Sequence, residues 1–227
     1  MQAKLVNFPS SRAKAPAERP HKQKTRPTRD FPYFNQKQIK LMRRTVRDAC
    51  NLARQKRGIT AVREWMLIDL LTSTGLRSAE AADLRCGDIR AAYGQSALFV
   101  RDGKGSRPRT VQIPGSLKTH LNSFIKWKQA QGEPTNYDDH VFLGQRGAWT
   151  PAAVQQVCKK WIRKLGLDGN GICAHALRHS YAVELYRQNR DIRAVQKQLG
   201  HASIQTTQIY ADVLAEDIQN QVKGLWN

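Results

Sequence analysis

The chain has 227 residues, with 38 lysines and arginines against 18 acidic residues and a formal net charge of +20. This length allows one well-formed core, with or without an appendage. The charge points to a polyanionic partner, because each neutralised phosphate releases a counterion. The longest apolar run, "WMLIDLL", is short and interrupted by Asp69, so we expect no membrane association.

The four cysteines are scattered, with no CxxC pair, and the N-terminus is charged and proline-rich without an apolar stretch. This pattern predicts a protein of the reducing cytoplasm, associated with the nucleoid through DNA. Residues 1–33 form a predicted basic arm with prolines at positions 9, 16, 20 and 27 and few apolar residues. We expect this arm to be disordered. It is either a passive solvated tail or a segment that lies along nucleic acid.

Order is expected from residue 34. Asn35 can N-cap a helix, and Gln38 completes a capping box. A second, buried helix is predicted at about 61–73, with Gly75 at its C-terminal end. The first helix carries one apolar face, made of Ile39, Met42, Val46 and Cys50.

Two strand-like runs, "SALFV" and "RTVQIP", flank the glycine-rich "RDGKGSRP" within residues 96–113 and predict a hairpin. A further short strand is expected in "HVFL" at 140–143. A helix should follow Pro151, with an apolar stripe, and two or three shorter helices should follow residue 175. The predicted fold class is therefore mainly α with a small antiparallel β-sheet (α+β).

Polar residues stand at helix starts, turns and a loop tip. Arg77 opens the helix after Gly75, where a guanidinium joins free backbone N–H groups in a setting suited to phosphate. Glu80, one turn later, can brace Arg77 through an ion pair, although such pairs are usually surface salt bridges. Lys104 is predicted at the hairpin tip between two glycines.

The densest group lies in "HALRHSYAVELYRQNRDIRAVQKQLGHASIQTTQIY". His175 and Arg178 share a helix face, His201 follows a glycine that ends a helix, and Tyr210 lies on the next helix. Cys173, His175 and His179 also have a spacing typical of metal ligands, but Arg178 among them would repel a cation. We therefore expect no metal and no cofactor. Packed core histidines and a core tyrosine are the remaining alternative for each residue taken singly.

Taken together, these residue types suit attack on a phosphodiester. Two arginines can neutralise charge on a pentacoordinate phosphate, a tyrosine can attack phosphorus once a base takes its proton, and a lysine or histidine can protonate the leaving oxygen. The resulting phosphotyrosyl ester stores the energy of the broken bond, so neither a metal nor a nucleotide is required.

"TGLRSAE", the Lys104 turn, "HALRHSYA", "DIRAVQKQLGHASI" and "TTQIY" resemble, in order and separation, the tyrosine recombinase (phage integrase-type) family. The resemblance implies that Arg77 and Arg178 clamp the phosphate and that Tyr210 is the nucleophile. Three further roles come with it: Lys104 as general acid, His175 as proton acceptor for the tyrosine, and His201 as a second hydrogen-bond donor to the phosphate. Glu80 would brace Arg77.

The resemblance also implies a 3′-phosphotyrosine intermediate, a Holliday junction, and a homo-tetramer on two double-stranded DNA sites, with or without an accessory DNA-bending protein. Only the basic arm precedes Asn35, as in the small single-domain members that lack a full core-binding domain. The catalytic domain is then expected at 34–209. In the family, a segment such as 210–227 often packs on a neighbouring subunit, and the alternative is docking on its own core.

One departure from the family concerns Asn189-Arg190, which stands where a glycine is frequent before "DI". We expect the asparagine to tolerate the left-handed turn. Candidate contacts to DNA are Lys40, Arg43, Arg44 and Arg107. The leading interpretation is a site-specific recombinase that integrates, excises or inverts DNA. A type IB topoisomerase-like enzyme and a non-catalytic DNA-binding relative are the alternatives.

Overall fold

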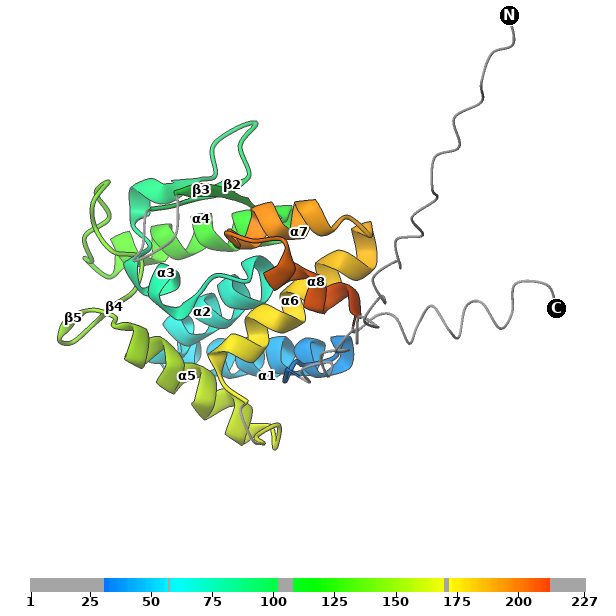
Figure 1. Cartoon of the computed structure of the whole chain (residues 1–227). Helices are drawn as coiled ribbons and strands as arrows, with labels where there is room; N and C mark the ends of the chain where they lie inside the picture. The colour runs from blue at the N-terminus through cyan, green and yellow to red at the C-terminus, as the bar shows by residue number, and fades with distance from the viewer. Residues whose placement is uncertain (1–30, 57, 102–107, 170–171, 213–227) are drawn as a thin grey trace, which may run out of the picture.

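A computed structural model describes residues 31–56, 58–101, 108–169 and 172–212 (Figure 1). Within these residues the fold is mainly helical with two small antiparallel sheets, which confirms the predicted class. The helices are α1 (Gln36–Gln55), α2 (Thr60–Thr74), α3 (Ser78–Asp83), η1 (Cys86–Asp88), α4 (Gly115–Ala130), α5 (Pro151–Lys164), α6 (Ala174–Asn189), α7 (Ile192–Leu199) and α8 (Gln205–Asp212). The strands are β1 (Ile89–Arg90), β2 (Ala97–Val100), β3 (Arg109–Gln112), β4 (Leu143–Gly144) and β5 (Gly147–Ala148).

Helix α1 begins where its sequence predicts. The Asn35 side chain accepts a hydrogen bond from the Gln38 backbone N–H at 2.9 Å, and the Gln38 side chain accepts from the Asn35 N–H at 2.9 Å. A cap of this kind stabilises a helix by about 1 kcal/mol. Met42, Val46 and Cys50 are buried on one face of α1, and that face packs on α2.

Helix α2 is the central element of the main core. It contacts α1, α4 and α6 (Figure 1), and its buried side chains are Val62, Met66, Leu67, Ile68, Leu70 and Leu71. A second, smaller core lies among α6, α7 and α8, and its buried members are Ala182, Val183, Val195, Leu199 and Tyr210. Tyr210 is thus held by a small group of helices beside the main core. No helix in the described ranges is long and apolar enough to cross a membrane.

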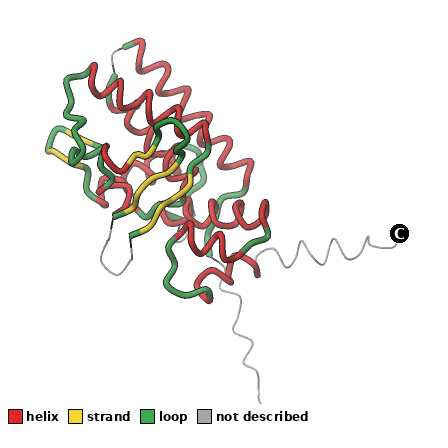
Figure 2. Tube along the Cα trace, turned by 90° about the horizontal axis from the view of Figure 1, so that it is seen from above, coloured by secondary structure: helices red, strands yellow, loops and turns green. Residues whose placement is uncertain are grey.

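The three-stranded sheet has the order β1-β2-β3 and lies to one side of the helices (Figure 2). The hairpin β2–β3 confirms the prediction, with Leu98 opposite Val111. Helix α7 is joined to β3 because Gln198 exchanges two hydrogen bonds with the Gln112 backbone, at 3.1 and 2.7 Å. This junction brings the hairpin against the helices of the smaller core.

One expectation needs correction, and two elements were not predicted. The strand expected at 140–143 begins only at Leu143, in the small β4–β5 hairpin, and His140 instead forms an isolated bridge with Arg85. Helix α4 was not predicted, although Leu117, Leu121 and Phe124 have helical spacing and are buried. Strand β1 was likewise not predicted, because two residues carry too little alternation to be recognised.

The turn between α6 and α7 places its left-handed residue one position later than expected. Asn189 is the last residue of α6, and Arg190 adopts φ 52°, ψ 20°. A residue with a Cβ is strained in this region by about 1–2 kcal/mol, whereas glycine loses more backbone entropy on folding.

We therefore expect Arg190→Gly to raise the free energy of unfolding by about 0.5–1 kcal/mol. Urea denaturation followed by circular dichroism measures the change. Asn189→Gly is the matched comparison, and it should lower stability because that residue is helical. A stabilising Asn189→Gly would instead favour the turn that the sequence predicted.

Candidate active site

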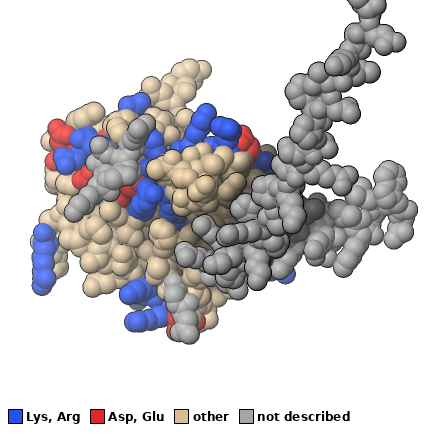
Figure 3. Space-filling model, viewed as in Figure 1, with Lys and Arg blue, Asp and Glu red and all other residues tan. Residues whose placement is uncertain are grey.

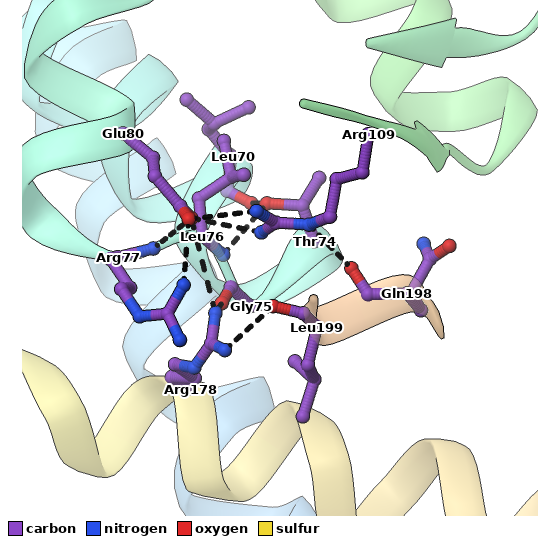
Figure 4. Close-up of polar contacts among 10 residues, drawn as sticks. All are labelled: Leu70, Thr74, Gly75, Leu76, Arg77, Glu80, Arg109, Arg178, Gln198 and Leu199. Atoms are coloured by element: carbon purple, nitrogen blue, oxygen red, sulfur yellow. Dashed lines mark hydrogen bonds and ion pairs between the residues drawn. The ribbon is translucent and has the colours of Figure 1, made fainter. Parts of the chain in front are cut away.

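The turn after α2 is the structural centre of the site. Gly75 ends α2 with φ 64°, and its carbonyl oxygen accepts a hydrogen bond from Arg178 Nη1 at 2.7 Å (Figure 4). Arg178 Nη2 donates to the Leu199 carbonyl at 2.7 Å. The Arg178 side chain is only 1% exposed. Two backbone carbonyls from separate elements therefore fix the orientation of this buried guanidinium.

Gly75 tolerates no side chain here. A Cβ at this position would lie 2.5 Å from Tyr181 Cδ1 and 2.9 Å from Leu199 Cδ2. We expect Gly75→Ala to lower the free energy of unfolding by about 2–4 kcal/mol, because the left-handed strain adds to overpacking. Urea denaturation measures the loss.

The matched control for that change is Gly132→Ala. Gly132 has φ +70°, but a Cβ there would have nothing within 4 Å. It should show the left-handed cost alone, about 1–2 kcal/mol. Equal losses in the two variants would contradict the steric argument for Gly75.

The Glu80 carboxylate contacts three arginines. Arg77 N-caps α3, and Glu80 accepts from its backbone N–H at 2.8 Å and from its Nη1 at 2.9 Å. Arg109 donates hydrogen bonds from Nη1 and Nη2 to the two Glu80 carboxylate oxygens, at 2.8 and 2.9 Å. Arg178 Nη1 lies 3.9 Å from Glu80 Oε2 (Figure 4). The predicted brace of Arg77 is therefore present, and it extends to two further cations.

The surroundings of Glu80 keep it ionised. Burial would raise its pKa, but the hydrogen bonds and charge of Arg109, the Arg77 N–H and the charge of Arg178 outweigh burial and lower the pKa to about 2. The Glu80 side chain is 5% exposed. A buried carboxylate that remains charged is the counterion that allows the arginines to lie so close together.

Arg109 is a site residue that was not predicted from the sequence. It is the first residue of β3, and its Nε also donates to the Gln198 carbonyl at 3.2 Å. The sequence offered one weak signal, a second arginine in "SRPRT" directly after the predicted turn. Its partner Glu80 is 29 residues away, so no local pattern links the two.

Tyr210 lies on α8 and is 1% exposed. Its hydroxyl is 3.0 Å from His179 Nδ1. The Phe31 ring meets the Tyr210 ring edge-on at 5.4 Å, and the His201 ring is stacked on it at 6.2 Å. Burial raises the pKa of Tyr210, while the charges of Arg178 and Arg77 oppose that rise. The phenol is therefore protonated near neutral pH and needs a proton acceptor to become a nucleophile.

Three histidines surround the Tyr210 hydroxyl and the arginines. Burial, followed by the charges of Arg178 and Arg77, lowers the pKa of His175. Burial and neighbouring charges lower the pKa of His179 to about 4 and that of His201 to about 4. These imidazoles are neutral near pH 7 and are able to accept a proton.

The structure brings together most of the predicted site residues, namely Arg77, Glu80, His175, Arg178, His201 and Tyr210. Lys104 and Arg107 lie outside the described residues. His201 Nδ1 lies 3.0 Å from Thr207 Oγ1, a contact that joins the turn before α8 to the first turns of that helix. His175 meets the His179 ring edge-on at 4.8 Å.

The three candidate DNA contacts on α1 differ from one another. Lys40 and Arg44 are exposed. Arg43 is partly buried and pairs with Asp69 at 2.5 Å, and its Nη1 donates to the Thr72 and Ser73 hydroxyls. Its guanidinium therefore already has protein partners in this structure.

Comparisons with known proteins identify the family of this chain. The model of the phage integrase family matches residues 53–217. Tyrosine recombinase XerA of Pyrococcus furiosus is 33% identical over 166 residues, which is 71% of this chain and 54% of that protein. Tyrosine recombinase XerC of Herpetosiphon aurantiacus is 34% identical over 157 residues, which is 69% of this chain and 50% of that protein. The chain thus spans about half the length of these relatives.

Solved structures show the same arrangement of helices and sheets. A crystal structure of XerA recombinase aligns with a TM-score of 0.70 and 24% identity, over 87% of this chain and 67% of that chain. A XerH site-specific recombinase, in a post-cleavage complex with a palindromic difH substrate, aligns with a TM-score of 0.69 and 27% identity, over 86% of this chain and 53% of that chain. The chain therefore belongs to the phage integrase family of tyrosine recombinases.

Proposed function

We propose that this chain cuts and rejoins DNA at specific sites by transesterification through Tyr210. The observation that carries the proposal is the position of the Tyr210 hydroxyl. It lies 3.0 Å from an imidazole nitrogen and in the field of Arg178 and Arg77. Both arginines are held by one ionised carboxylate, Glu80. These contacts support the proposal that Tyr210 is the nucleophile beside a proton acceptor and a phosphate clamp.

In the proposed reaction, Arg77 and Arg178 bind the non-bridging oxygens of the scissile phosphate, and His201 adds a hydrogen bond. The Tyr210 oxygen loses its proton and attacks phosphorus, which forms the O–P bond of a 3′-phosphotyrosine. The P–O5′ bond breaks, and the leaving 5′-oxygen takes a proton from the general acid, the role that the family resemblance gives to Lys104. Rejoining is the reverse displacement by a 5′-hydroxyl.

DNA is the partner that the charge favours. On the visible described surface, Lys and Arg side chains cover more area than Asp and Glu do (Figure 3), and the chain has a net charge of +20. A surface of this sign attracts the phosphate backbone and releases counterions. XerH has been crystallised on its difH substrate. By analogy, we propose double-stranded DNA as the substrate of this chain.

Assembly is a second part of the proposal. A tetramer on two DNA sites, exchange through a Holliday junction, and packing of residues 210–227 on a neighbouring subunit all come from the family resemblance. Residues 213–227 lie outside the described residues. Gel filtration and crosslinking on DNA that carries two sites test the tetramer directly.

A covalent-capture experiment tests the chemistry. Purified protein is incubated with nicked DNA fragments from the flanks of its own gene and separated in denaturant. We expect a denaturant-resistant adduct, which peptide mapping would place on Tyr210. Relaxation of supercoiled plasmid by a monomer, with no joining of two sites, would favour the topoisomerase alternative. Binding without an adduct on any fragment would count against catalysis and favour the DNA-binding alternative.

A further inference from the structure

We propose that His179 is a catalytic residue that holds the Tyr210 hydroxyl and receives its proton during DNA cleavage. This inference rests on the proposed function and refines it, because the resemblance had given the proton to His175. In the structure, His179 Nδ1 lies 3.0 Å from Tyr210 Oη. His175 meets the edge of the His179 ring instead, with the ring centroids 4.8 Å apart and the planes at 86°.

The His179 ring is fixed by its neighbours. It follows Arg178 on α6, so it is anchored in the same helix turn as a buried guanidinium. Phe31 covers it with a centroid distance of 4.7 Å, His175 lies edge-on to it, and the Tyr210 ring lies 5.7 Å away. An imidazole held on these sides has little rotational freedom, and its Nδ1 stays directed at the reacting oxygen.

The surroundings of His179 keep its imidazole neutral before DNA binds. His175 and Arg178 share α6 with it, Tyr210 faces it from α8, and His201 faces it from the turn before α8. Burial, with His175 and Arg178, lowers the pKa of His179 to about 4. The ring is therefore neutral before DNA binds. The incoming phosphate is an anion, and its charge stabilises the imidazolium that forms during attack.

The proton and the bonds balance in one step. As the Tyr210 oxygen bonds to phosphorus, its proton passes to His179 Nδ1, the P–O5′ bond breaks, and the 5′-oxygen takes a proton from the general acid. In rejoining, the tyrosine leaves phosphorus and takes its proton back from His179. His179 therefore acts on the tyrosine side of the reaction, whereas the general acid acts on the side of the leaving strand.

Two substitutions distinguish two roles of His179: hydrogen bonding to the Tyr210 hydroxyl and acceptance of its proton. In His179→Asn, an amide takes the place of Nδ1 and still hydrogen-bonds the hydroxyl, but it cannot accept a proton near pH 7. In His179→Ala both roles are lost. We expect each variant to slow formation of the covalent adduct on a nicked phosphodiester substrate by about 10²–10³-fold. His140→Asn, the same exchange at a position in the Arg85 bridge, should behave as the unmodified protein does.

A substrate with sulfur in place of the bridging 5′-oxygen then tests whether His179 acts on the tyrosine or on the leaving group. A thiolate leaves without being protonated, so loss of the general acid no longer matters. We expect Lys104→Ala to recover adduct formation on the sulfur substrate, while His179→Asn and His179→Ala remain slow. Added imidazole should partly restore His179→Ala, because it can enter the space that the missing ring leaves.

Three results would overturn the inference. The first is His179→Asn within about threefold of the unmodified protein. The second is recovery of the His179 variants on the sulfur substrate, and the third is a defect in His175→Asn without one in His179→Asn. Circular dichroism melting of each variant establishes that it is folded. Absence of an adduct with the unmodified protein on any fragment would instead refute the proposed function, and the role of His179 with it.

Discussion

Replacing Tyr210 by phenylalanine is expected to abolish covalent capture of DNA while leaving the fold and DNA binding intact. The phenyl ring keeps its packing against Phe31 and His201. The hydroxyl has one hydrogen-bond partner among the described residues, His179, so its loss costs about 1 kcal/mol. Loss of the attacking oxygen should lower the cleavage rate by more than about 10³-fold, as removal of a nucleophile does in other enzymes.

The measurement combines the denaturing adduct gel with a native mobility shift on the same fragments. Tyr186→Phe is the matched control, because Tyr186 is a partly buried tyrosine of α6 that packs against the same small core. It should form the adduct at the normal rate. If Tyr210→Phe still forms an adduct, another side chain is the nucleophile and the proposed mechanism fails.

Replacing Glu80 by glutamine is expected to lower the free energy of unfolding by about 3–5 kcal/mol near pH 7, because removing one partner of a buried ion pair leaves uncompensated charge in the interior. Here the change leaves Arg77, Arg109 and Arg178 near one another without their shared anion. We also expect weak cleavage, because the two proposed clamp arginines lose their common support.

The pH dependence identifies the cause of this loss. The pKa of Glu80 is lowered from 4.5 to about 2, so its stabilisation is fully present above pH 4.5 and is lost as the pH falls toward 2. The shift corresponds to about 3 kcal/mol. The histidines with lowered pKa values destabilise both proteins as the pH falls from 6.5 toward 4. Their effect cancels when the variant is compared with the unmodified protein.

Urea denaturation at pH values from 7 down to 3 measures that difference. It should shrink steadily below pH 4.5. Glu184→Gln is the control for the exchange itself. That carboxylate is hydrogen-bonded to two glutamine amides near the surface, and its loss should change stability by less than about 0.5 kcal/mol. A difference between Glu80→Gln and the unmodified protein that stays constant with pH would contradict the assignment to the Glu80 carboxylate.

The sequence predicted the features that depend on neighbours along the chain. The capping box of Asn35 and Gln38, the end of α2 at Gly75 and the β2–β3 hairpin all follow from local patterns, and the structure confirms them. The left-handed residue was misplaced by one position, because Asn189 and Arg190 stand side by side and helix length decides between them. Composition alone does not predict the last residue of a helix to within one position.

The sequence predicted most of the residues that form the site, but it did not predict which of them contact one another. Arg77 is the N-cap of the short helix that contains Glu80, so their pairing was expected. Arg109 reaches Glu80 from a strand 29 residues away, and only the docking of the sheet creates that contact. The partner of Tyr210 was equally hidden. His175 and His179 both lie on α6, and the position of α8 decides which of them faces the hydroxyl.

The bidentate pair between Arg109 and Glu80 connects strand β3 to the proposed phosphate clamp. Arg109 begins the strand that follows residues 102–107, the segment that contains Lys104, and Glu80 also supports the proposed phosphate clamp. One carboxylate thus holds both the proposed phosphate clamp and the first residue of β3. Under the proposed function, any movement of Glu80 displaces the proposed phosphate clamp and the first residue of β3 together, so the two cannot shift independently.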